Sequence, residues 1–295
     1  MIITKLIGGL GNQMFQYAAG RRAAYVNNTE LKLDISGYKH QKNLTKRQYL
    51  LNIFNIHEKF ASPIEIFLLT FPERFFIRKH LTLFHKLTSR FCKQKYISQI
   101  PLQFDQRALA IKNNTYLEGF WGSEKYFIDI KEIIYQEFCL KNKPDSFNEQ
   151  IINKITHSNS VALHVRRGDY VSDRKTHEFH GLCSSRYYFH AIKLITSKIN
   201  NPHFFIFSDD LEWVKKNIKL KYPTNYVVHN YGKQDHEDLR LMSNCCHNII
   251  ANSSFSWWGA WLNQNPQKIV IVPKYWFKDK SISTKYLIPK SWKRL

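Results

Sequence analysis

The sequence predicts an α/β protein of two halves, and the C-terminal half is expected to contain a parallel sheet flanked by helices. In the C-terminal half, short apolar segments rich in β-branched and aromatic residues alternate with helical patterns, which is typical of a doubly wound sheet. The N-terminus opens with the same order of strand, loop, helix and strand. A length of 295 residues also favours two domains over a single core.

The two domains are expected to meet near a polar, proline-containing stretch at residues 141–145. We therefore predict an N-terminal domain over residues 1–150 and a C-terminal domain over residues 151–295. In the first domain, strands are expected at residues 2–6, 31–34 and 115–120, and a helix at 14–26. In the second, strands are expected at residues 161–165, 203–207, 226–229, 248–251 and 268–272, and helices at 185–198, 211–218, 236–244 and 255–262.

The chain is strongly basic, with a formal net charge of +21. A positive field of this size attracts nucleic acid, anionic membrane surfaces or phosphorylated substrates. Part of the excess lies in residues 57–99, where Lys and Arg are interleaved with Phe. Amphipathic helices with a solvated basic face would explain this segment, and so would a surface that binds anionic lipid. No nucleic-acid-binding motif accompanies the charge, so we expect no nucleic-acid partner.

Several features of the sequence bear on location. The N-terminus has the pattern of a strand rather than of a secretory leader, and the longest apolar run, residues 64–71, is too short to span a bilayer. Five cysteines without a C-x-x-C pair argue against a disulfide framework and a zinc site. We therefore expect a cytoplasmic protein, and peripheral attachment to the inner face of the membrane stays open through the basic segment.

A glycine-rich loop at residues 8–13 joins the first strand to the first helix. Its glycines would let backbone amides approach a ligand at the helix N-terminus, or would simply allow a turn and a cap. A dinucleotide-binding fingerprint would have Gly or Ala where this chain has Met14. Asp34 nevertheless stands where a ribose-binding acid would, so an NAD-type oxidoreductase remains an alternative.

The strand at 161–165 ends in the sequence HVRRGDY, residues 164–170. Alternate residues of a strand share a face, so His164 and Arg166 are expected to point together and Arg167 the opposite way. An arginine at the end of a buried strand needs an anion, and its planar fork suits a diphosphate. The alternative is an ion pair of Arg166 with Asp169 that ends the strand.

Ser208, Asp209 and Asp210 follow the next strand, and the two aspartates are expected as N-terminal residues of the following helix. They do not have the Asp-x-Asp spacing that chelates a metal-bound diphosphate. His177 and His180 have metal-like spacing but fall in a predicted polar loop without thiolate support. We therefore expect no metal site.

The strand at 248–251 runs into the sequence NSSFSWWGAW, residues 252–261. The amides and hydroxyls of Ser253, Ser254 and Ser256 would form an anion cradle at a helix N-terminus. Alternatively, Ser254 caps the helix and the tryptophans pack in the core. Because parallel strands end at one edge of a sheet, Arg166, Ser208 and Ser253 are expected to reach one ligand.

Three motifs taken together carry a family resemblance: GGLGNQMFQY at residues 8–17, HVRRGDY at 164–170 and NSSFSWWGAW at 252–261. The chain resembles the α-1,2-fucosyltransferases of glycosyltransferase family 11, of the bacterial type. The three motifs span almost the whole chain, and the set is highly specific. The central element alone is less so, because it also resembles that of α-1,6-fucosyltransferases and protein O-fucosyltransferases. Residues 37–103 match no motif, and acceptor choice is expected to reside there.

The resemblance implies a GT-B-like fold, that is, two Rossmann-like domains with a cleft between them. It implies GDP-β-L-fucose as donor and an inverting transfer of L-fucose to the 2-hydroxyl of a terminal galactose, with no metal and no cofactor. The product would be a bacterial surface polysaccharide such as O-antigen, and a lipid-linked acceptor stays open. A GDP-fucose-dependent enzyme of another linkage is the nearest alternative.

The resemblance also implies roles for single residues. Arg166 would hold the β-phosphate and act in catalysis, and His164 and Asp238 would contact the guanosine. Asn12 would approach the reacting centre from the N-terminal, acceptor-side domain. Further donor contacts are expected from Ser208, Asn252, Ser253, Ser254, Phe255 and Ser256, and from Gly11 and Gln13. Asp169 is assigned to catalysis, while Asp34, Glu118 and Glu124 are also conceivable as general bases.

Overall fold

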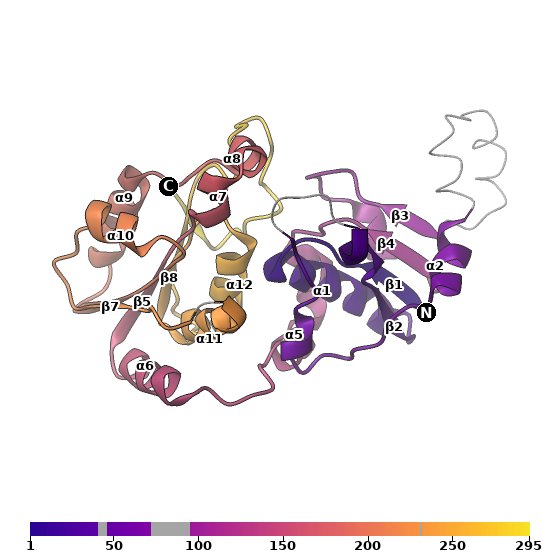
Figure 1. The fold of residues 1–295 in the computed structure, drawn as a ribbon, viewed down its shortest axis with the longest axis horizontal. Coiled ribbons are helices and arrows are strands. Elements are labelled where there is room, and N and C mark those ends of the chain that lie inside the picture. Colours follow the sequence, from indigo (N-terminus) through magenta and orange to yellow (C-terminus); the bar gives the residue numbers. More distant parts are fainter. Residues whose placement is uncertain (41–45, 72–94, 231) are drawn as a thin grey trace. The chain divides into compact units, whose positions relative to one another are not determined.

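The computed structural model describes residues 1–40, 46–71, 95–230 and 232–295. The chain divides into two compact units (Figure 1). The first comprises Met1–Lys141 with Lys285–Leu287, and the second comprises Asn142–Thr284 with Ile288–Leu295. Helix α6 (Ser146–Thr156), which spans the expected domain boundary at residue 150, belongs to the second unit.

The first unit contains a parallel sheet with the strand order β2-β1-β4-β3. The strands are β1 (Ile2–Lys5), β2 (Leu31–Asp34), β3 (Tyr96–Ser98) and β4 (Thr115–Glu118). The three predicted strands are confirmed. The sequence does not predict β3, because a strand of three residues is too short to show an alternating pattern.

The first unit also contains helices α1 (Leu10–Val26), α2 (Pro63–Thr70) and α5 (Lys131–Glu137). Among the described residues, short 3-10 segments accompany them: η1 (Ser36–His40), η2 (Leu51–Ile53), η3 (Gln106–Ala110), η4 (Glu124–Tyr126) and η5 (Ile128–Ile130). The predicted start of α1 at Met14 is wrong. The amides of Asn12 and Gln13 both donate to the carbonyl of Gly9, at 3.0 and 3.1 Å, so the second half of the glycine loop is the first turn of the helix.

The segment Lys285–Leu287 joins the first unit although it is far away in sequence. The ring of Tyr286 stacks on Phe104, with 4.8 Å between the ring centroids. The hydroxyl of Ser123 donates to the carbonyl of Tyr286 at 2.6 Å, and the Lys125 ammonium lies 4.5 Å from the centroid of its ring. The first unit is therefore completed by a short piece of the C-terminal sequence.

The sheet of the second unit is also parallel, with the order β10-β9-β8-β5-β6-β7. Its strands are β5 (Asn159–Val165), β6 (Pro202–Ser208), β7 (Thr224–Tyr226), β8 (His247–Ile249), β9 (Val270–Val272) and β10 (Lys293–Arg294). The strand predicted at 226–229 begins earlier, because main-chain pairing with β6 rather than the apolar run sets its position. Within that run, Val227 is buried but Val228 is 56% exposed.

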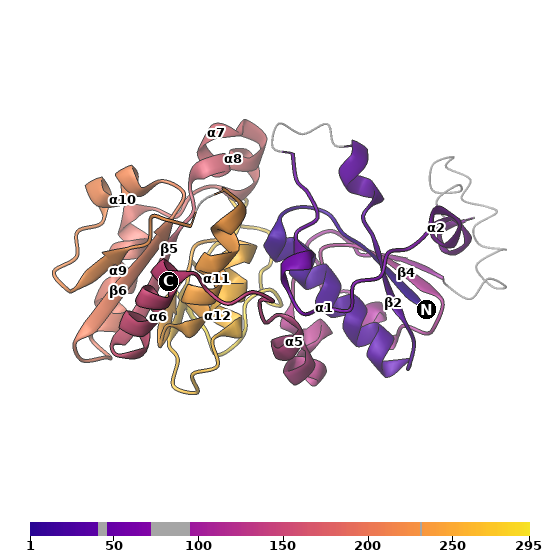
Figure 2. The same cartoon turned by 60° about the horizontal axis from the view of Figure 1, so that its bottom comes forward.

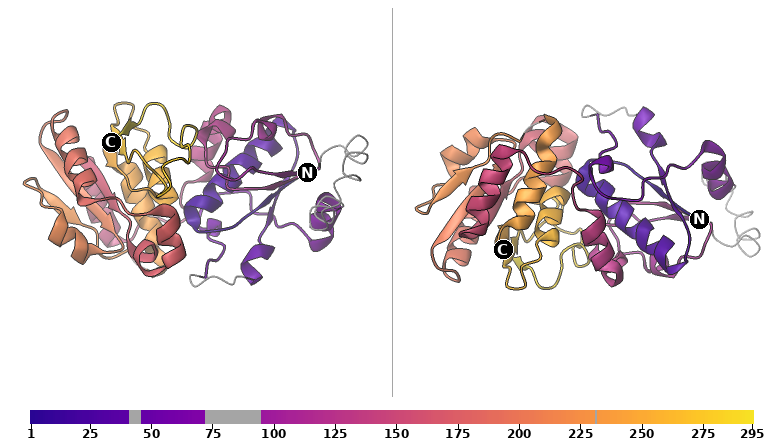
Figure 3. Two further views of the ribbon diagram at one scale, coloured as in Figure 1. Left: turned by 90° about the horizontal axis from the view of Figure 1, so that it is seen from above. Right: turned by 90° about the horizontal axis from the view of Figure 1, so that it is seen from below.

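Helices cover both faces of this second sheet (Figures 2 and 3). Helices α9 (Ser185–Thr196) and α10 (Leu211–Asn217) pack on one face, over a core that includes Val161, Leu163 and Ile206. Helices α6, α11 (Asp235–Asn244) and α12 (Ser254–Leu262) pack on the other, around Ala162 and Phe205. The remaining elements are α7 (Gly168–Ser172), α8 (Arg174–His180) and η6 (Gly232–Gln234). The predicted doubly wound arrangement is confirmed.

Four further expectations concern the basic segment, two histidines, metal binding and membrane-spanning helices. Of the basic, aromatic segment at 57–99, residues 72–94 lie outside the described residues. His177 and His180 lie on helix α8 and not in a loop, because Asp173 accepts two backbone N–H groups and caps that helix. In the described ranges, no group of three or more His, Cys, Asp or Glu residues could hold a metal ion. The described helices include none that is long and apolar enough to cross a bilayer.

Candidate active site

Three loops that follow neighbouring strands meet at one edge of the second sheet. Strands β8, β5 and β6 are adjacent and parallel, so their carboxyl ends share this edge. The Tyr170 hydroxyl donates to the carbonyl of Asn252 at 3.1 Å, which joins the β5 loop to the β8 loop. Arg166 pairs with Asp209 at 2.9 Å, which joins the β5 loop to the β6 loop. The predicted convergence of these strand ends is confirmed.

The guanidinium of Arg166 lies between two carboxylates. Its Nη2 donates to Asp169 at 2.6 Å, and its Nη1 lies 2.9 Å from Asp209. Burial lowers the pKa of the Arg166 guanidinium. The nearby carboxylates of Asp209 and Asp169 outweigh burial and raise this pKa above its usual range. The alternative ion pair with Asp169 is thus present in the structure. The Arg166 side chain is still 27% exposed and its Nε has no hydrogen bond to the described residues, so an anionic ligand can reach it.

Asp209 is a functional candidate that the sequence reasoning missed. The N-cap of α10 is Asp210, whose side chain accepts the amide of Trp213 at 3.0 Å, and Asp209 turns away from that helix. Its Oδ1 instead accepts the backbone N–H of Arg167 at 2.7 Å. A Cβ on Gly168 would lie 2.6 Å from Asp209 Oδ2, so a glycine is required beside this carboxylate. The signal in the sequence is a pair of aspartates after one buried strand and a pair of arginines after another.

Arg167 lies on the opposite side of the strand end from Arg166, as the alternation predicts. Its Nε donates to Asp210 at 2.8 Å, and its Cζ lies 4.4 Å from the centroid of the Trp213 ring. Both partners belong to α10 or its cap. Arg167 therefore anchors that helix to the β5 loop.

His164 is buried on the other face, where its ring lies 5.9 Å from the ring of Phe255 on α12. Burial lowers the pKa of His164 to about 4; Asp209 opposes this shift and Arg166 adds to it. The imidazole is therefore neutral near pH 7. Its Nδ1 is buried and finds no hydrogen-bond partner among the described residues. Because an unsatisfied buried nitrogen is costly, this atom marks a place for a ligand with a polar group.

The serine-rich turn forms the N-terminus of α12, and its N-cap is Ser253 rather than Ser254. The Ser253 side chain makes no capping hydrogen bond, so the first-turn amides of this helix are not satisfied by it. The buried hydroxyl of Ser256 donates to the carbonyls of Ala251 and Ser253, at 3.4 and 3.2 Å. Ser256 therefore shapes the turn, and the backbone amides are left as the groups that would meet an anion.

Two other predicted donor-binding residues also make internal contacts. The Asn252 amide donates to the carbonyls of His180 and Trp276, at 3.0 and 3.1 Å, which fixes the turn before α12. The Ser208 hydroxyl accepts the backbone N–H of Asp210 at 3.0 Å. Both side chains hold the loops in place at the edge of the sheet.

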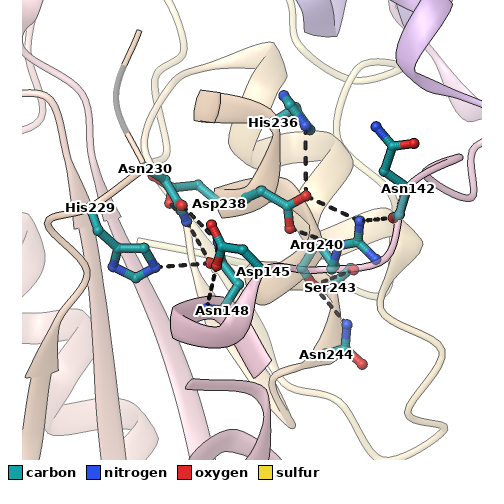
Figure 4. A network of polar contacts seen from close by, with 11 residues as sticks. Asn142, Asp145, Asn148, His229, Asn230, His236, Asp238, Arg240, Ser243 and Asn244 are labelled. Carbon is teal, nitrogen blue, oxygen red and sulfur yellow. Dashed lines mark hydrogen bonds and ion pairs between the residues drawn. The ribbon is translucent and has the colours of Figure 1, made fainter. Parts of the chain in front are cut away.

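Asp238 lies on the first turn of α11 and belongs to a network of polar side chains (Figure 4). Asn230 donates to Asp238 Oδ1 at 3.0 Å and exchanges hydrogen bonds with Asn148 at 2.9 Å. The His229 ring lies 3.0 Å from the same Asn148 amide oxygen. Burial raises the pKa of Asp238 to about 7, Asn230 opposes the shift, and Asp235 adds to it. Asp238 Oδ2 has no hydrogen bond within the described chain, so this carboxylate can accept from a ligand.

A pocket of about 440 Å³ adjoins this edge of the second unit. Asn252 and His180 line it, together with Lys274, Lys278 and Lys280. None of the side chains that line it is an aspartate or a glutamate. The pocket therefore adds positive potential beside the strand ends.

In the first unit, the glycine loop and Asn12 form a separate group. Gly8 has a φ of +79°, and a Cβ there would lie 2.6 Å from the side-chain nitrogen of Asn12. Glycine is therefore required for both reasons. The Asn12 side chain is half-buried and makes no hydrogen bond to the described residues, so its amide is available to a ligand.

Gln13 and Gly11 are buried in the first turns of α1. The Gln13 side chain donates to the carbonyls of Gly8 and Gln48, at 3.0 and 2.8 Å, and accepts the amide of Leu50 at 2.9 Å. Its polar groups are thus taken up by the backbone, and any effect of Gln13 on a ligand has to pass through the loop that it holds.

Two of the conceivable general bases already accept hydrogen bonds from other side chains of the first unit. Asp34 is 1% exposed and accepts the Tyr116 hydroxyl at 2.5 Å. Glu118 accepts from Lys5 and from the Tyr96 hydroxyl, at 2.5 and 2.6 Å. Because the carboxylate of Asp34 is buried and engaged, it cannot bind a ribose, and the oxidoreductase alternative is not retained.

Comparison with known proteins agrees with the motifs. The family model described as Glycosyl transferase family 11 matches residues 1–294. The chain belongs to glycosyltransferase family 11. It is 36% identical to an α-1,2-colitosyltransferase of Escherichia coli over 301 residues, with 100% of this chain and 99% of that protein covered. It is 32% identical to the O-antigen biosynthesis glycosyltransferase WbnK of Escherichia coli, with 92% and 93% covered.

Among solved structures, this family 11 glycosyltransferase is similar to the NodZ α-1,6-fucosyltransferase of Bradyrhizobium, in a crystal soaked with GDP-fucose. The TM-score is 0.50 at 15% sequence identity, with 92% of this chain and 94% of that chain covered. At this identity the likeness concerns the fold alone. The predicted GT-B-like α/β fold with two parallel sheets is confirmed.

The position of Asp209 in this glycosyltransferase generates a prediction. Asp209→Asn keeps an oxygen for the Arg167 amide but removes one of the two charges that orient Arg166. We expect turnover to fall roughly 10- to 100-fold, because misplacing a charged group costs this much in a preorganised site. The KM for the donor should fall or stay unchanged, because one anionic competitor for the guanidinium is gone. Steady-state kinetics with varied donor concentration measures both.

Asp210→Asn is the matched control, because it keeps an acceptor for the α10 cap and removes charge only from Arg167. Its turnover should stay close to that of the unmodified enzyme. If Asp209→Asn and Asp210→Asn lower turnover equally, Asp209 has no special part in orienting Arg166.

Proposed function

We propose that this family 11 glycosyltransferase transfers L-fucose from GDP-β-L-fucose to the 2-hydroxyl of a terminal galactose, with inversion, during surface polysaccharide or O-antigen synthesis. The observation that carries the proposal is the partly exposed Arg166 guanidinium at the meeting point of three strand ends. Beside it lie the unsatisfied Nδ1 of His164 and the uncapped N-terminus of α12. These groups suit a nucleoside diphosphate.

In this proposal the second unit binds the donor. Arg166 holds the β-phosphate, and the amides that begin at Ser253, Ser254 and Phe255 bind the diphosphate, with Ser256, Asn252 and Ser208 shaping the loops. His164 contacts the guanosine, and the free oxygen of Asp238 accepts hydrogen bonds from the guanine. The first unit contributes Asn12 near the reacting centre, while Gly11 and Gln13 hold its loop.

The chemistry requires stabilisation of a growing negative charge. As the bond from sugar to phosphate breaks, charge accumulates on the departing GDP, and Arg166 together with the α12 amides stabilises it. The sugar gains oxocarbenium character, and the galactose hydroxyl attacks from the opposite face. Asp169 orients Arg166 through its 2.6 Å contact and is the carboxylate assigned to catalysis. A loose transition state needs little help from a base.

A second candidate donor is the GDP conjugate of colitose. It is favoured by the α-1,2-colitosyltransferase that is 36% identical over the full length of both chains. Both donors present the same nucleotide, so the groups described above serve either. Residues that contact the sugar ring would distinguish fucose from colitose.

The proposed setting follows from charge and family. We propose a cytoplasmic enzyme, peripheral on the inner face of the membrane, that acts on a lipid-linked glycan and has no nucleic-acid partner. The net charge of +21 supports attraction to anionic surfaces.

The donor and the metal requirement can be tested in one assay. With a β-galactoside acceptor, we expect transfer from GDP-fucose to proceed in excess EDTA, because the sequence has no Asp-x-Asp motif and the described residues offer no metal-binding cluster. Mass spectrometry and NMR of the product would identify the α-1,2 linkage. Transfer only from GDP-colitose would make colitose the donor, and loss of activity restored by Mg²⁺ would contradict the metal-free mechanism.

Arg166 and Arg167 should respond differently to substitution. Arg166→Ala removes a charge-assisted contact worth about 1.5–3 kcal/mol in donor binding. Turnover should fall further, roughly 100- to 1,000-fold, because the leaving-group charge grows in the transition state. Arg166→Lys should restore little, since an ammonium cannot form the bidentate fork. GDP titration and single-turnover kinetics separate the two effects.

Arg167→Ala is the matched control at the neighbouring position. It should lower the melting temperature, through the lost contacts with Asp210 and Trp213, and change turnover less. A fully active Arg166→Ala, with a folded but inactive Arg167→Ala, would reverse the assignment of the two faces.

The raised pKa of Asp238 predicts that GDP affinity depends on pH. The guanine can donate hydrogen bonds to Asp238 only while this carboxylate is ionised. Asp238 has a pKa of about 7, so it becomes protonated as the pH falls below 7. GDP affinity should therefore weaken as pH falls below 7, by about tenfold per unit well below the pKa. Asp238→Asn should bind more weakly and lose this dependence. Calorimetric titrations that show the same slope in both proteins would rule out Asp238 as the titrating group.

A further inference from the structure

Helix α2 has apolar side chains on two opposite faces. One face packs on the first sheet, where Leu69 is buried in a core cluster and Ile66 packs against it. The other face carries Ile64, Phe67 and Leu68, which are 72%, 56% and 58% exposed. In Figure 1, α2 lies beside β4 at the margin of the first unit.

The exposed side chains form one continuous stripe. Positions 64, 67, 68 and 71 have the i, i+3, i+4, i+7 spacing of a single helix face. Phe71, just beyond the helix, is 49% exposed and its ring stacks on Phe67 with 5.1 Å between the centroids. A surface helix of a globular domain normally keeps its outer face polar, and exposed apolar patches mark interaction sites.

The helix is well formed in the isolated chain. Ser62 and Glu65 make a capping box, in which Glu65 Oε2 accepts the Ser62 amide at 2.8 Å. The same carboxylate pairs with Lys32 at 2.6 Å. The stripe is therefore presented on a preformed, anchored helix, and a partner need not order it.

We propose that the outer face of α2 docks on an anionic membrane surface, with Ile64, Phe67 and Leu68 at the lipid interface. Charge selects this partner, because the chain carries +21 and the sequence after α2, residues 72–95, contains seven Lys or Arg residues and a single Glu. Apolar side chains next to basic ones bind the interface of anionic bilayers. A second copy of the chain would bring the same positive charge and be repelled.

The proposal goes beyond the transfer reaction and does not rest on it. No residue of this face is assigned to the donor or to the reacting centre. The face can therefore be tested by binding alone, with neither donor nor acceptor present.

The test is sedimentation of the whole protein with vesicles of phosphatidylglycerol mixed equally with phosphatidylcholine. The unmodified protein should bind, and binding should weaken as salt is raised. The triple variant Ile64→Ser, Phe67→Ser, Leu68→Ser should bind on the order of 10-fold or more weakly, because its apolar insertion is lost. Its melting temperature should be unchanged, because none of the three side chains belongs to the buried core cluster. Phe67→Ser alone should give a smaller loss of the same sign, and it replaces the triple variant if that variant unfolds.

Phe189→Ser is the matched control, since Phe189 is 64% exposed on α9 of the second unit. It should bind vesicles like the unmodified protein. Equal binding by the α2 variants, or no binding by the unmodified protein, would overturn the proposal. A dimer in gel filtration that the triple variant converts to a monomer would show that a second copy occupies the face, which also overturns it.

Discussion

The pairing of Arg166 with Asp169 and Asp209 is the interaction on which the site in the second unit depends. The guanidinium is held from two sides, by Asp169 at 2.6 Å and by Asp209 at 2.9 Å, so its position depends on both carboxylates. Asp209 also holds the Arg167 amide and fills the space that a side chain at position 168 would need. One carboxylate therefore fixes the conformation of the β5 loop and joins it to the β6 loop.

The same junction sets the electrostatics of the site. One guanidinium faces two carboxylates, so the local charge is negative until the α12 amides and the lysines of the adjoining pocket are included. A ligand with one anionic oxygen gains little by competing with two aspartates. A diphosphate offers several acceptors at once, and it can reach both the guanidinium and a helix N-terminus. In the proposed function, the arrangement favours a ligand with several anionic oxygens over a ligand with one.

Much of the fold could be predicted because both sheets are parallel. Strands such as β5 and β6 are buried on both faces, so they are continuous apolar runs that stand out in the sequence. The opposite directions of Arg166 and Arg167 follow from the two-residue period of a strand. By contrast, β3, β7 and β10 are short strands whose position is fixed by main-chain pairing, which leaves no pattern in the side chains.

The candidate site was predictable in its location but less so in its contacts. Strand ends in a parallel sheet must share an edge, which places Arg166 near the serine turn. The network of Asn148, Asn230 and Asp238 depends on α6 packing beside a loop 82 residues away, and no local signal encodes that. Asp209 and Gln13 carry ordinary helix-terminal patterns in the sequence. Only the tertiary structure shows that the first orients an arginine and the second holds a loop.

The return of Lys285–Leu287 to the first unit has a consequence for how these enzymes recombine. A gene fusion made at residue 141 would pair an N-terminal half with a foreign Tyr286 position, and so disturb the stack on Phe104 and the bond from Ser123. Transfer of the intact first unit to another protein therefore requires two separate stretches of the gene rather than one. The N-terminal half is therefore not structurally self-contained, even though the last strand of its sheet, β4, ends at residue 118.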